Sequence, residues 1–176
     1  TDPRLPSKIY QGITTEINGE GESIAPLNDA MLKEMQPGLD HYDIKVDWTT
    51  FEGYFARLRK QGIGINMGTY IGAATVREMV IGYDNRAPNA DELKRMQALV
   101  ADGMRQGTMG LSSALQYAPA PYASTDELIA LAKLASQYGG IYATHMRSEG
   151  KEELAALDES LRSGRKAHVP VENYEL

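Results

Sequence analysis

A cluster of ionisable side chains, residues 144–149 (Thr-His-Met-Arg-Ser-Glu), directly follows the short apolar stretch 141–143. This stretch has the composition of a buried strand, and in parallel α/β folds the catalytic groups lie at the carboxyl ends of strands. His145 is therefore a candidate metal ligand or general base. The alternative is a core histidine that is satisfied by hydrogen bonds.

A second polar cluster, residues 19–23 (Gly-Glu-Gly-Glu-Ser), also follows a predicted strand, residues 12–18. A glycine-rich turn can hold phosphate on its amides, but Glu20 and Glu22 would repel an anion, and no Lys-Ser/Thr pair follows as a P-loop requires. The glycines of residues 62–68 have the wrong final spacing for a dinucleotide loop. Nucleotide binding is thus the weakest of the function hypotheses.

The helix ahead of His145 is delimited by sequence signals on both sides. Ser124 and Glu127 form an S-x-x-E capping box at its start. Gly139 supplies the left-handed residue that favours a helix end. This helix and the strand after it are the elements that would position the histidine.

Other helices are indicated by caps and by apolar residues at helical spacing. They are predicted over residues 26–36, 48–60, 74–80, 89–106 and 151–163. Pro37-Gly38 is expected to stop the first of them, and Asn89 to cap the fourth. Met96 and Met104 on that fourth helix are expected to fill the core rather than to bind a ligand. The apolar face of the last helix is predicted to consist of three leucines, Leu154, Leu157 and Leu161.

Five strands are predicted between these helices, over residues 12–18, 63–68, 110–114, 141–143 and 169–172. Strands that alternate with helices and show no hairpin signals indicate a parallel sheet of βα units, an α/β fold. No internal repeat or low-complexity linker divides the chain. Its 176 residues are enough for one sizeable core.

Composition narrows the classes of function. A net charge of -6 with scattered Lys and Arg argues against a general nucleic-acid surface. No stretch approaches the roughly 20 apolar residues of a membrane span. The absence of cysteine rules out disulfides and thiolate metal sites and fits a reducing compartment. Without a signal-type apolar run at a start that lacks Met and looks trimmed, a cytoplasmic protein that acts on small molecules is expected.

Several motifs in order along the chain carry a resemblance to a known family. They are residues 11–15 (Gln-Gly-Ile-Thr-Thr), the glycine-rich turn through residues 23–26, residues 107–113 (Gly-Thr-Met-Gly-Leu-Ser-Ser), residues 115–119 (Leu-Gln-Tyr-Ala-Pro) and residues 144–149. Together they resemble the D-aminoacylase (N-acyl-D-amino-acid deacylase) branch of the amidohydrolase superfamily. The match runs along essentially the whole chain.

The resemblance implies a (β/α)8 TIM-barrel amidohydrolase in which one or two zinc ions activate water against the amide of an N-acyl-D-amino acid. His145 occupies the position of the metal-binding histidine in the family's H-x-R-x-E stretch. Tyr117 matches a tyrosine that contacts the substrate near the scissile group. Glu20 lies where well-known members have a metal-binding cysteine, and a carboxylate is a harder ligand that can bridge two ions. Glu22 is close enough to be the ligand in its place.

Other parts of the family pattern are expected to lie outside the chain. The H-x-H pair should precede Thr1, the second metal-binding histidine aligns with Glu175, and the aspartate that serves as general base lies beyond Leu176. Residues 1–176 are therefore expected to be the central part of the barrel, about five βα units, without the flanking β domain. The remaining histidines, His41 and His168, are expected to be exposed.

Two hypotheses follow from this expectation. The parent protein is a zinc-dependent amidohydrolase, although residues 1–176 alone are expected to be inactive. Alternatively, the chain is a catalytically incompetent relative that serves as a structural or interaction module. An open parallel sheet would expose unpaired edges, so self-association is expected in that case.

Overall fold

The computed structural model describes residues 2–174, and all strand pairs within this range are parallel. One sheet pairs β1 (Thr15–Asn18) with β2 (Asn66–Thr69). The other has the order β3 (Ile71–Gly72), β4 (Gly110–Ala114), β5 (Ile141–His145) and β6 (Val171–Asn173). The predicted α/β fold with a parallel sheet is confirmed.

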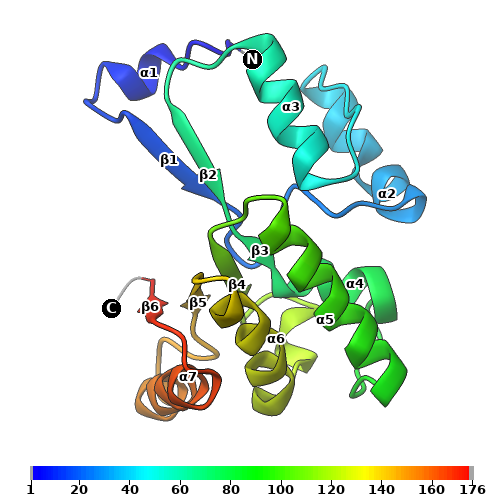
Figure 1. Cartoon of the computed structure of the whole chain (residues 1–176), viewed down its shortest axis with the longest axis vertical. Helices are drawn as coiled ribbons and strands as arrows, with labels where there is room; N and C mark the ends of the chain where they lie inside the picture. The colour runs from blue at the N-terminus through cyan, green and yellow to red at the C-terminus, as the bar shows by residue number, and fades with distance from the viewer. Residues whose placement is uncertain (1, 175–176) are drawn as a thin grey trace.

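The two sheets are joined through Tyr70, the single residue that separates β2 from β3. Its N–H donates to the carbonyl of Asn18 (2.9 Å), which continues the β1 ladder. Thr69 in turn accepts a hydrogen bond from Met109, just before β4 (2.9 Å). β2 and β3 thus form one interrupted strand, and the five predicted strand positions are all occupied (Figure 1).

The helices fall into two groups (Figure 1). Those at the end of the molecule with β1 and β2 are α1 (Pro6–Ile9), α2 (Asp29–His41) and α3 (Phe51–Gln61). Those that pack along β3 to β6 are α4 (Ala73–Ile81), α5 (Ala90–Arg105), α6 (Thr125–Gln137) and α7 (Glu153–Ala167). A short 3-10 helix, η1 (Ala120–Tyr122), lies in the loop after β4. No described helix combines the length and the apolar character that crossing a membrane requires.

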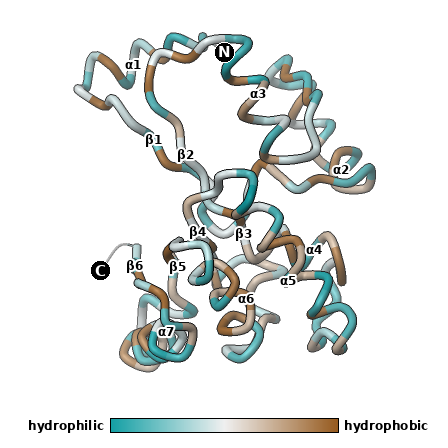
Figure 2. The backbone as a smooth tube through the Cα atoms, viewed as in Figure 1, coloured by the Kyte–Doolittle hydropathy of each residue, from teal (hydrophilic) through white to brown (hydrophobic). Residues whose placement is uncertain are grey.

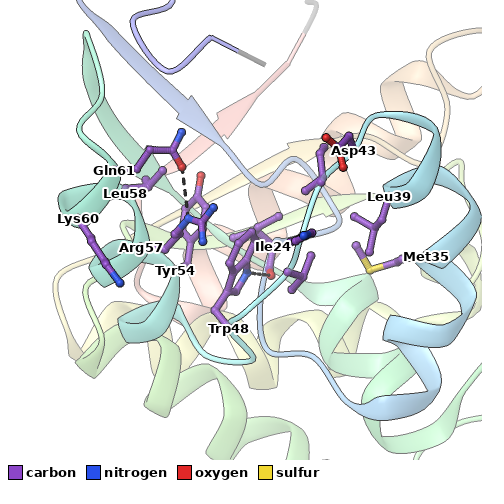
Figure 3. A pocket seen from close by; sticks show the side chains of 13 residues that line it. Ile24, Met35, Leu39, Asp43, Trp48, Tyr54, Arg57, Leu58, Lys60 and Gln61 are labelled. Atoms are coloured by element: carbon purple, nitrogen blue, oxygen red, sulfur yellow. Dashed lines mark hydrogen bonds between the residues drawn. The ribbon is translucent and has the colours of Figure 1, made fainter.

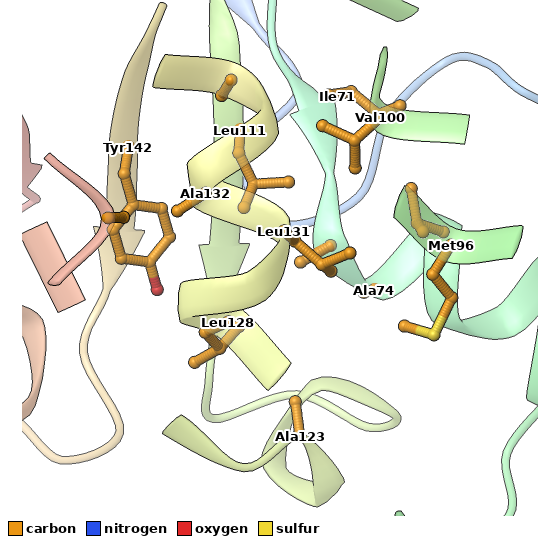
Figure 4. Packing of buried hydrophobic residues seen from close by; sticks show 14 of the residues in the cluster. Ile71, Ala74, Met96, Val100, Leu111, Ala123, Leu128, Leu131, Ala132 and Tyr142 are labelled. Atoms are coloured by element: carbon orange, nitrogen blue, oxygen red, sulfur yellow. The ribbon is translucent and has the colours of Figure 1, made fainter. Parts of the chain in front are cut away.

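The core lies between the sheet and α4 to α7. Strand residues such as Leu111 and Tyr142 pack against Leu131 of α6, and Met96 of α5 is fully buried (Figure 4). The predicted role of Met96 and Met104 as core residues is confirmed. Figure 2 shows the hydrophobic colour recurring along the segments that meet at this core. The sheet therefore has one face covered by helices and the other turned away from them.

The prediction that Pro37-Gly38 stops a helix is wrong, because α2 continues through both residues to His41. A proline inside a helix removes one hydrogen bond, here the one to the carbonyl of Lys33. Lys33 and Pro37 are both exposed, so water can satisfy the carbonyl that the proline leaves unpaired. The surface position of α2 reduces the cost of the proline.

The predicted apolar face of α7 is also wrong. Leu154 is 82% exposed and Leu161 is 42% exposed, whereas the buried positions carry small side chains. These are Ala156, Ser160, Ser163, Gly164 and Ala167. A Cβ at Gly164 would lie 2.2 Å from Cγ2 of Val171 on β6. The helix packs so close to β6 that only small residues fit between them. Periodicity alone cannot reveal this distance, and it predicts that the leucines are buried instead.

The capping signals are largely confirmed. Asn89 and Glu92 form a reciprocal capping box at the start of α5. Ser124 caps α6 by accepting a hydrogen bond from the N–H of Glu127 (3.2 Å). The carboxylate of Glu127 does not complete that box, because it forms a buried ion pair with Arg77 of α4. The sequence gives no signal for this pairing across 50 residues.

Candidate active site

His145 ends β5 and lies between two carboxylates. Its Nε2 contacts a carboxylate oxygen of Glu20, and its Nδ1 lies 2.8 Å from Oε1 of Glu149. The imidazole is 16% exposed, so it reaches the surface at the end of the strand and is not enclosed in the core. The structure thus brings together the two predicted metal-binding residues, which are 125 positions apart in the sequence.

Glu149 determines how the histidine is oriented. A hydrogen bond between Nδ1–H of His145 and the Glu149 carboxylate leaves the lone pair of Nε2 facing Glu20. This bond, together with one from Gln116, holds the pKa of Glu149 below its usual range. The carboxylate is therefore ionised at neutral pH and keeps the proton of the ring on Nδ1.

Glu20 is carried by the tight loop that follows β1. The next residue, Gly21, has a φ of +74°, and a Cβ there would lie 2.5 Å from Cβ of Ala114 at the end of β4. The loop is also fastened further on, since the N–H of Ser23 donates to Thr75 (2.8 Å) and its Oγ accepts from Gly72 (3.0 Å). The backbone around Glu20 is therefore fixed against two strands while its side chain remains half-exposed.

Tyr117, the predicted substrate contact, lies in the loop after β4 and is exposed. It lines a cavity of about 290 Å³ together with residues of the Glu20 loop and the ends of two neighbouring elements. The other lining residues are Glu20, Gly21, Glu22, Ala74 and Ala114. The structure therefore places Tyr117 and Glu20 at one cavity, with His145 in contact with Glu20.

Glu22, the alternative ligand, lines the same cavity. Within residues 2–174, the carboxylates that His145 contacts are those of Glu20 and Glu149, and Glu22 takes no part in these contacts. The charge of Glu22 acts instead on Glu78 of α4: burial raises the pKa of Glu78, and the charges of Glu34 and Glu22 raise it further. Of the two loop glutamates, Glu20 is the one that the fold directs at the histidine.

A larger cavity, of about 690 Å³, lies between α2 and α3 (Figure 3). Its lining includes Met35, Leu39, Trp48 and Tyr54, and the indole of Trp48 donates to the carbonyl of Ile24 (3.1 Å). None of its lining residues is a histidine, and none belongs to β4, β5 or the loops that follow them. The chemistry of the chain is therefore concentrated at the smaller cavity.

Arg147 belongs to the same H-x-R-x-E stretch as His145 but turns toward α7. Its Nε and Nη2 each lie 2.9 Å from a carboxylate oxygen of Glu159. Nη1 donates to the carbonyl of Pro121 and Nη2 to that of Ala123, both at 2.9 Å. Arg147 therefore fastens the η1 loop and β5 to α7. Sequence reasoning missed this role because nothing local marks Glu159 as its partner.

The Arg147–Glu159 pair predicts a pH-dependent contribution to stability. Burial raises the pKa of Glu159, but the hydrogen bonds from Arg147 and Thr125 outweigh burial and hold it below the ordinary value of 4.5. A carboxyl whose pKa is lowered by folding stabilises the fold above its unfolded pKa, and this contribution is lost as the pH falls through the folded value. We expect Glu159→Gln to lower the free energy of unfolding by about 1–2 kcal/mol at about pH 7.

Urea unfolding of the wild type and of Glu159→Gln at about pH 7 and about pH 3 measures this contribution. The difference between the two proteins should shrink toward the lower pH, because the wild-type carboxyl takes up its proton as the pH falls through its folded pKa. An equal difference at both pH values would contradict the role assigned to the ionised pair.

The donors at this site fit part of a metal centre. Zinc in proteins is bound by carboxylate oxygen and by imidazole nitrogen. A metal-binding histidine usually donates its other ring N–H to a carboxylate, which orients the ring, and Glu149 is placed to do this for His145. Catalytic zinc takes three protein ligands. No group of three or more His, Asp or Glu side chains that could hold a metal is found within residues 2–174. Glu175, which the resemblance to the family aligns with a third ligand, lies outside the described residues.

The other two histidines lie apart from this site. His41 ends α2 and His168 follows α7 in a left-handed conformation (φ 54°), and both are exposed as predicted. The N–H of His168 closes the end of α7 by donating to the carbonyl of Gly164, and its own carbonyl accepts a hydrogen bond from Ser136 of α6 (2.6 Å).

Comparison with known proteins agrees with the resemblance read from the motifs. No family model matches the chain. The D-aminoacylase of Alcaligenes xylosoxydans xylosoxydans is 38% identical over 165 residues, which are 93% of this chain and 34% of that protein. The N-acyl-D-glutamate deacylase of the same organism is 34% identical over 64% of this chain and 23% of its own length.

Solved structures give the same result. A D-aminoacylase structure that concerns the binuclear metal centre superposes with a TM-score of 0.84 and 36% identity, covering 96% of this chain and 36% of that one. The N-acyl-D-glutamate deacylase of Bordetella bronchiseptica, solved with zinc and a phosphonate inhibitor, gives a TM-score of 0.81 and 30% identity. It covers 97% of this chain and 36% of its own. The chain thus spans about a third of the length of these relatives, and along that third it is a homologue of the D-aminoacylase branch of the TIM-barrel amidohydrolases.

Proposed function

We propose that the protein is a metal-dependent amidohydrolase that removes the acyl group from N-acyl-D-amino acids. The observation that carries this proposal is the contact between Glu20 and Nε2 of His145 at the carboxyl ends of two parallel strands. Homologues named for deacylation of N-acyl-D-amino acids support the substrate class. The structure of one of them with zinc and a mimic of the tetrahedral intermediate supports the type of reaction.

In this proposal Glu20 and His145 hold zinc through a carboxylate oxygen and Nε2. The metal, when bound, supplies a water molecule that is activated near neutral pH. Glu149 keeps the proton of His145 on Nδ1, so that Nε2 presents its lone pair. Tyr117 lines the same cavity as Glu20, and its phenol is proposed to donate a hydrogen bond to the carbonyl oxygen of the scissile amide.

The number of ions is proposed to be one or two. A D-aminoacylase relative has a binuclear centre described by activation through one metal and attenuation through the second. The side chain of Glu20 is half-exposed and lines the cavity, so its carboxylate could serve a second ion as well as the first. We propose that one ion is required and that a second modulates the activity.

The experiment that tests the proposal uses the parent protein, because residues 1–176 alone are expected to be inactive, and measures release of free amino acid from N-acetyl-D-amino acids and from their L-enantiomers. We expect D-selective hydrolysis that disappears after treatment with a chelator and returns with about one added zinc ion per chain. Hydrolysis that persists without metal would refute the proposed chemistry. A protein that binds zinc but hydrolyses neither enantiomer would instead favour the alternative, a catalytically incompetent structural or interaction module.

A further inference from the structure

Ser112 on β4 bonds to the backbone on both sides of Glu20. Its Oγ donates to the carbonyl of Gly19 and accepts a hydrogen bond from the N–H of Gly21 at 3.1 Å. Ser112 is fully buried, so water does not compete for these bonds. One hydroxyl therefore holds both residues that flank the proposed metal ligand.

The position of Ser112 in the sheet relates the loop to the histidine. In the register of β4 and β5, Ser112 pairs with Ala143, and Ala114 pairs with His145. Successive side chains on a strand point to opposite faces, so Ser112 and Ala114 share the face that meets the Glu20 loop. Because β5 is fixed to β4 by backbone hydrogen bonds, a bond from Ser112 to the loop also sets the distance between the loop and His145.

Ser113 provides a matched comparison on the other face of the same strand. Its Oγ lies 2.7 Å from the hydroxyl of Tyr142 and 2.6 Å from Oγ1 of Thr144. It is as fully buried as Ser112 and also takes part in two hydrogen bonds. These bonds lead to the helix-covered side of β5, and none of them reaches the Glu20 loop.

We propose that Ser112 is a positioning residue that holds Glu20 against His145 and so sets the geometry of the metal site. This inference rests on the proposed function, because it assigns to Glu20 the role of a ligand. Without the hydroxyl, the peptide groups on either side of Glu20 lose their attachment to β4. The carboxylate must then be ordered at the moment of metal binding, and removing such outer support weakens metal affinity by about 10–100-fold.

The first measurement compares the zinc affinity of the wild type, Ser112→Ala and Ser113→Ala by competition with a chromogenic chelator. We expect Ser112→Ala to bind zinc about 10–100-fold more weakly, while Ser113→Ala stays within about three-fold of the wild type. Circular dichroism and urea unfolding establish that both variants fold. Wild-type affinity in Ser112→Ala, or an equal loss in both variants, would overturn the proposal.

The second measurement needs no metal. A glutamate-specific protease is applied to the zinc-free proteins, and the cleavage after Glu20 and Glu22 is followed by mass spectrometry, with cleavage after the exposed Glu152 as internal reference. We expect cleavage in the loop to be several-fold faster in Ser112→Ala than in the wild type or in Ser113→Ala, since local opening exposes the backbone to proteases. Unchanged cleavage would refute the positioning role whether or not zinc binds. Failure of the wild type to bind zinc would refute the proposed function and leave this result to decide the role of Ser112.

Discussion

Replacing Arg77 with methionine should lower the free energy of unfolding by about 3–5 kcal/mol, because it leaves a buried carboxylate without its partner. The guanidinium Nη1 lies 2.8 and 2.9 Å from the two oxygens of Glu127, and the two side chains are 1% and 3% exposed. Nη2 also donates to the carbonyls of Asp84 (3.1 Å) and Arg86 (2.5 Å). The variant therefore loses every bond that connects α4 to the start of α6 and to the loop between α4 and α5 through this side chain.

Urea unfolding followed by the fluorescence of Trp48 measures the loss. Arg57→Met is the control, because Arg57 pairs with Asp47 at a similar distance (2.8 Å) but both side chains are well exposed. An exposed pair of this kind contributes about 0–1 kcal/mol. The double variant Arg77→Met with Glu127→Leu should recover much of the stability, since an apolar pair has no charge to desolvate. A loss in Arg77→Met no larger than that in Arg57→Met would show that the buried pair does not stabilise the fold.

The same pair shows where sequence reasoning about the fold reaches its limit. The start of α5 and the strand at residues 110–114 were predictable from the sequence, and the signal for the first, the capping residue Asn89, is local. Glu127 carries a local signal as well, but its carboxylate accepts hydrogen bonds from Arg77, which is 50 residues away in the sequence. Leaving a buried charge unpaired costs more free energy than completing a helix cap gains. The tertiary partner therefore determines where the side chain of Glu127 points.

The face of α7 illustrates a second limit. Leucines at positions 154, 157 and 161 have the spacing of an apolar stripe, yet the helix buries small residues against β6. Periodicity shows that a helix has two faces. The distance between the helix and the strand decides which face can pack against the sheet, and here the close approach of Gly164 to Val171 sets that distance. The helix itself was predictable from the sequence, and its orientation was not.

For the candidate site, the residues are a prediction from the sequence, and the structure supplies their relations. Glu20 and His145 follow from polar clusters at strand ends and from the resemblance to a family. The contact between them depends on the relative positions of β1 and β5. The strands between β1 and β5 set these positions through their register. The attachment of the loop to Ser112 and the turn of Arg147 toward Glu159 depend on the same three-dimensional placement.

Glu20→Ala and His145→Ala should each reduce bound zinc from about one equivalent to a trace after extensive dialysis, the largest effect expected at the site. Each variant removes one of the two donors that the described residues bring together, and a catalytic zinc site relies on about three protein ligands. Elemental analysis of the dialysed proteins measures the metal content. Added zinc should raise the melting temperature of the wild type and leave that of both variants unchanged, because only a state that binds the ligand is stabilised by it.

Two substitutions make this result specific to the proposed ligands. Glu22→Ala removes a carboxylate from the same loop and the same cavity, and His168→Ala removes an imidazole that is exposed at the end of α7. Both should keep their zinc, because neither side chain takes part in the contact between Glu20 and His145. Loss of zinc in Glu22→Ala with retention in Glu20→Ala would show that Glu22, and not Glu20, is the metal ligand. Full metal content in both Glu20→Ala and His145→Ala would exclude a zinc site at the end of β5, and with it the chemistry proposed for this protein.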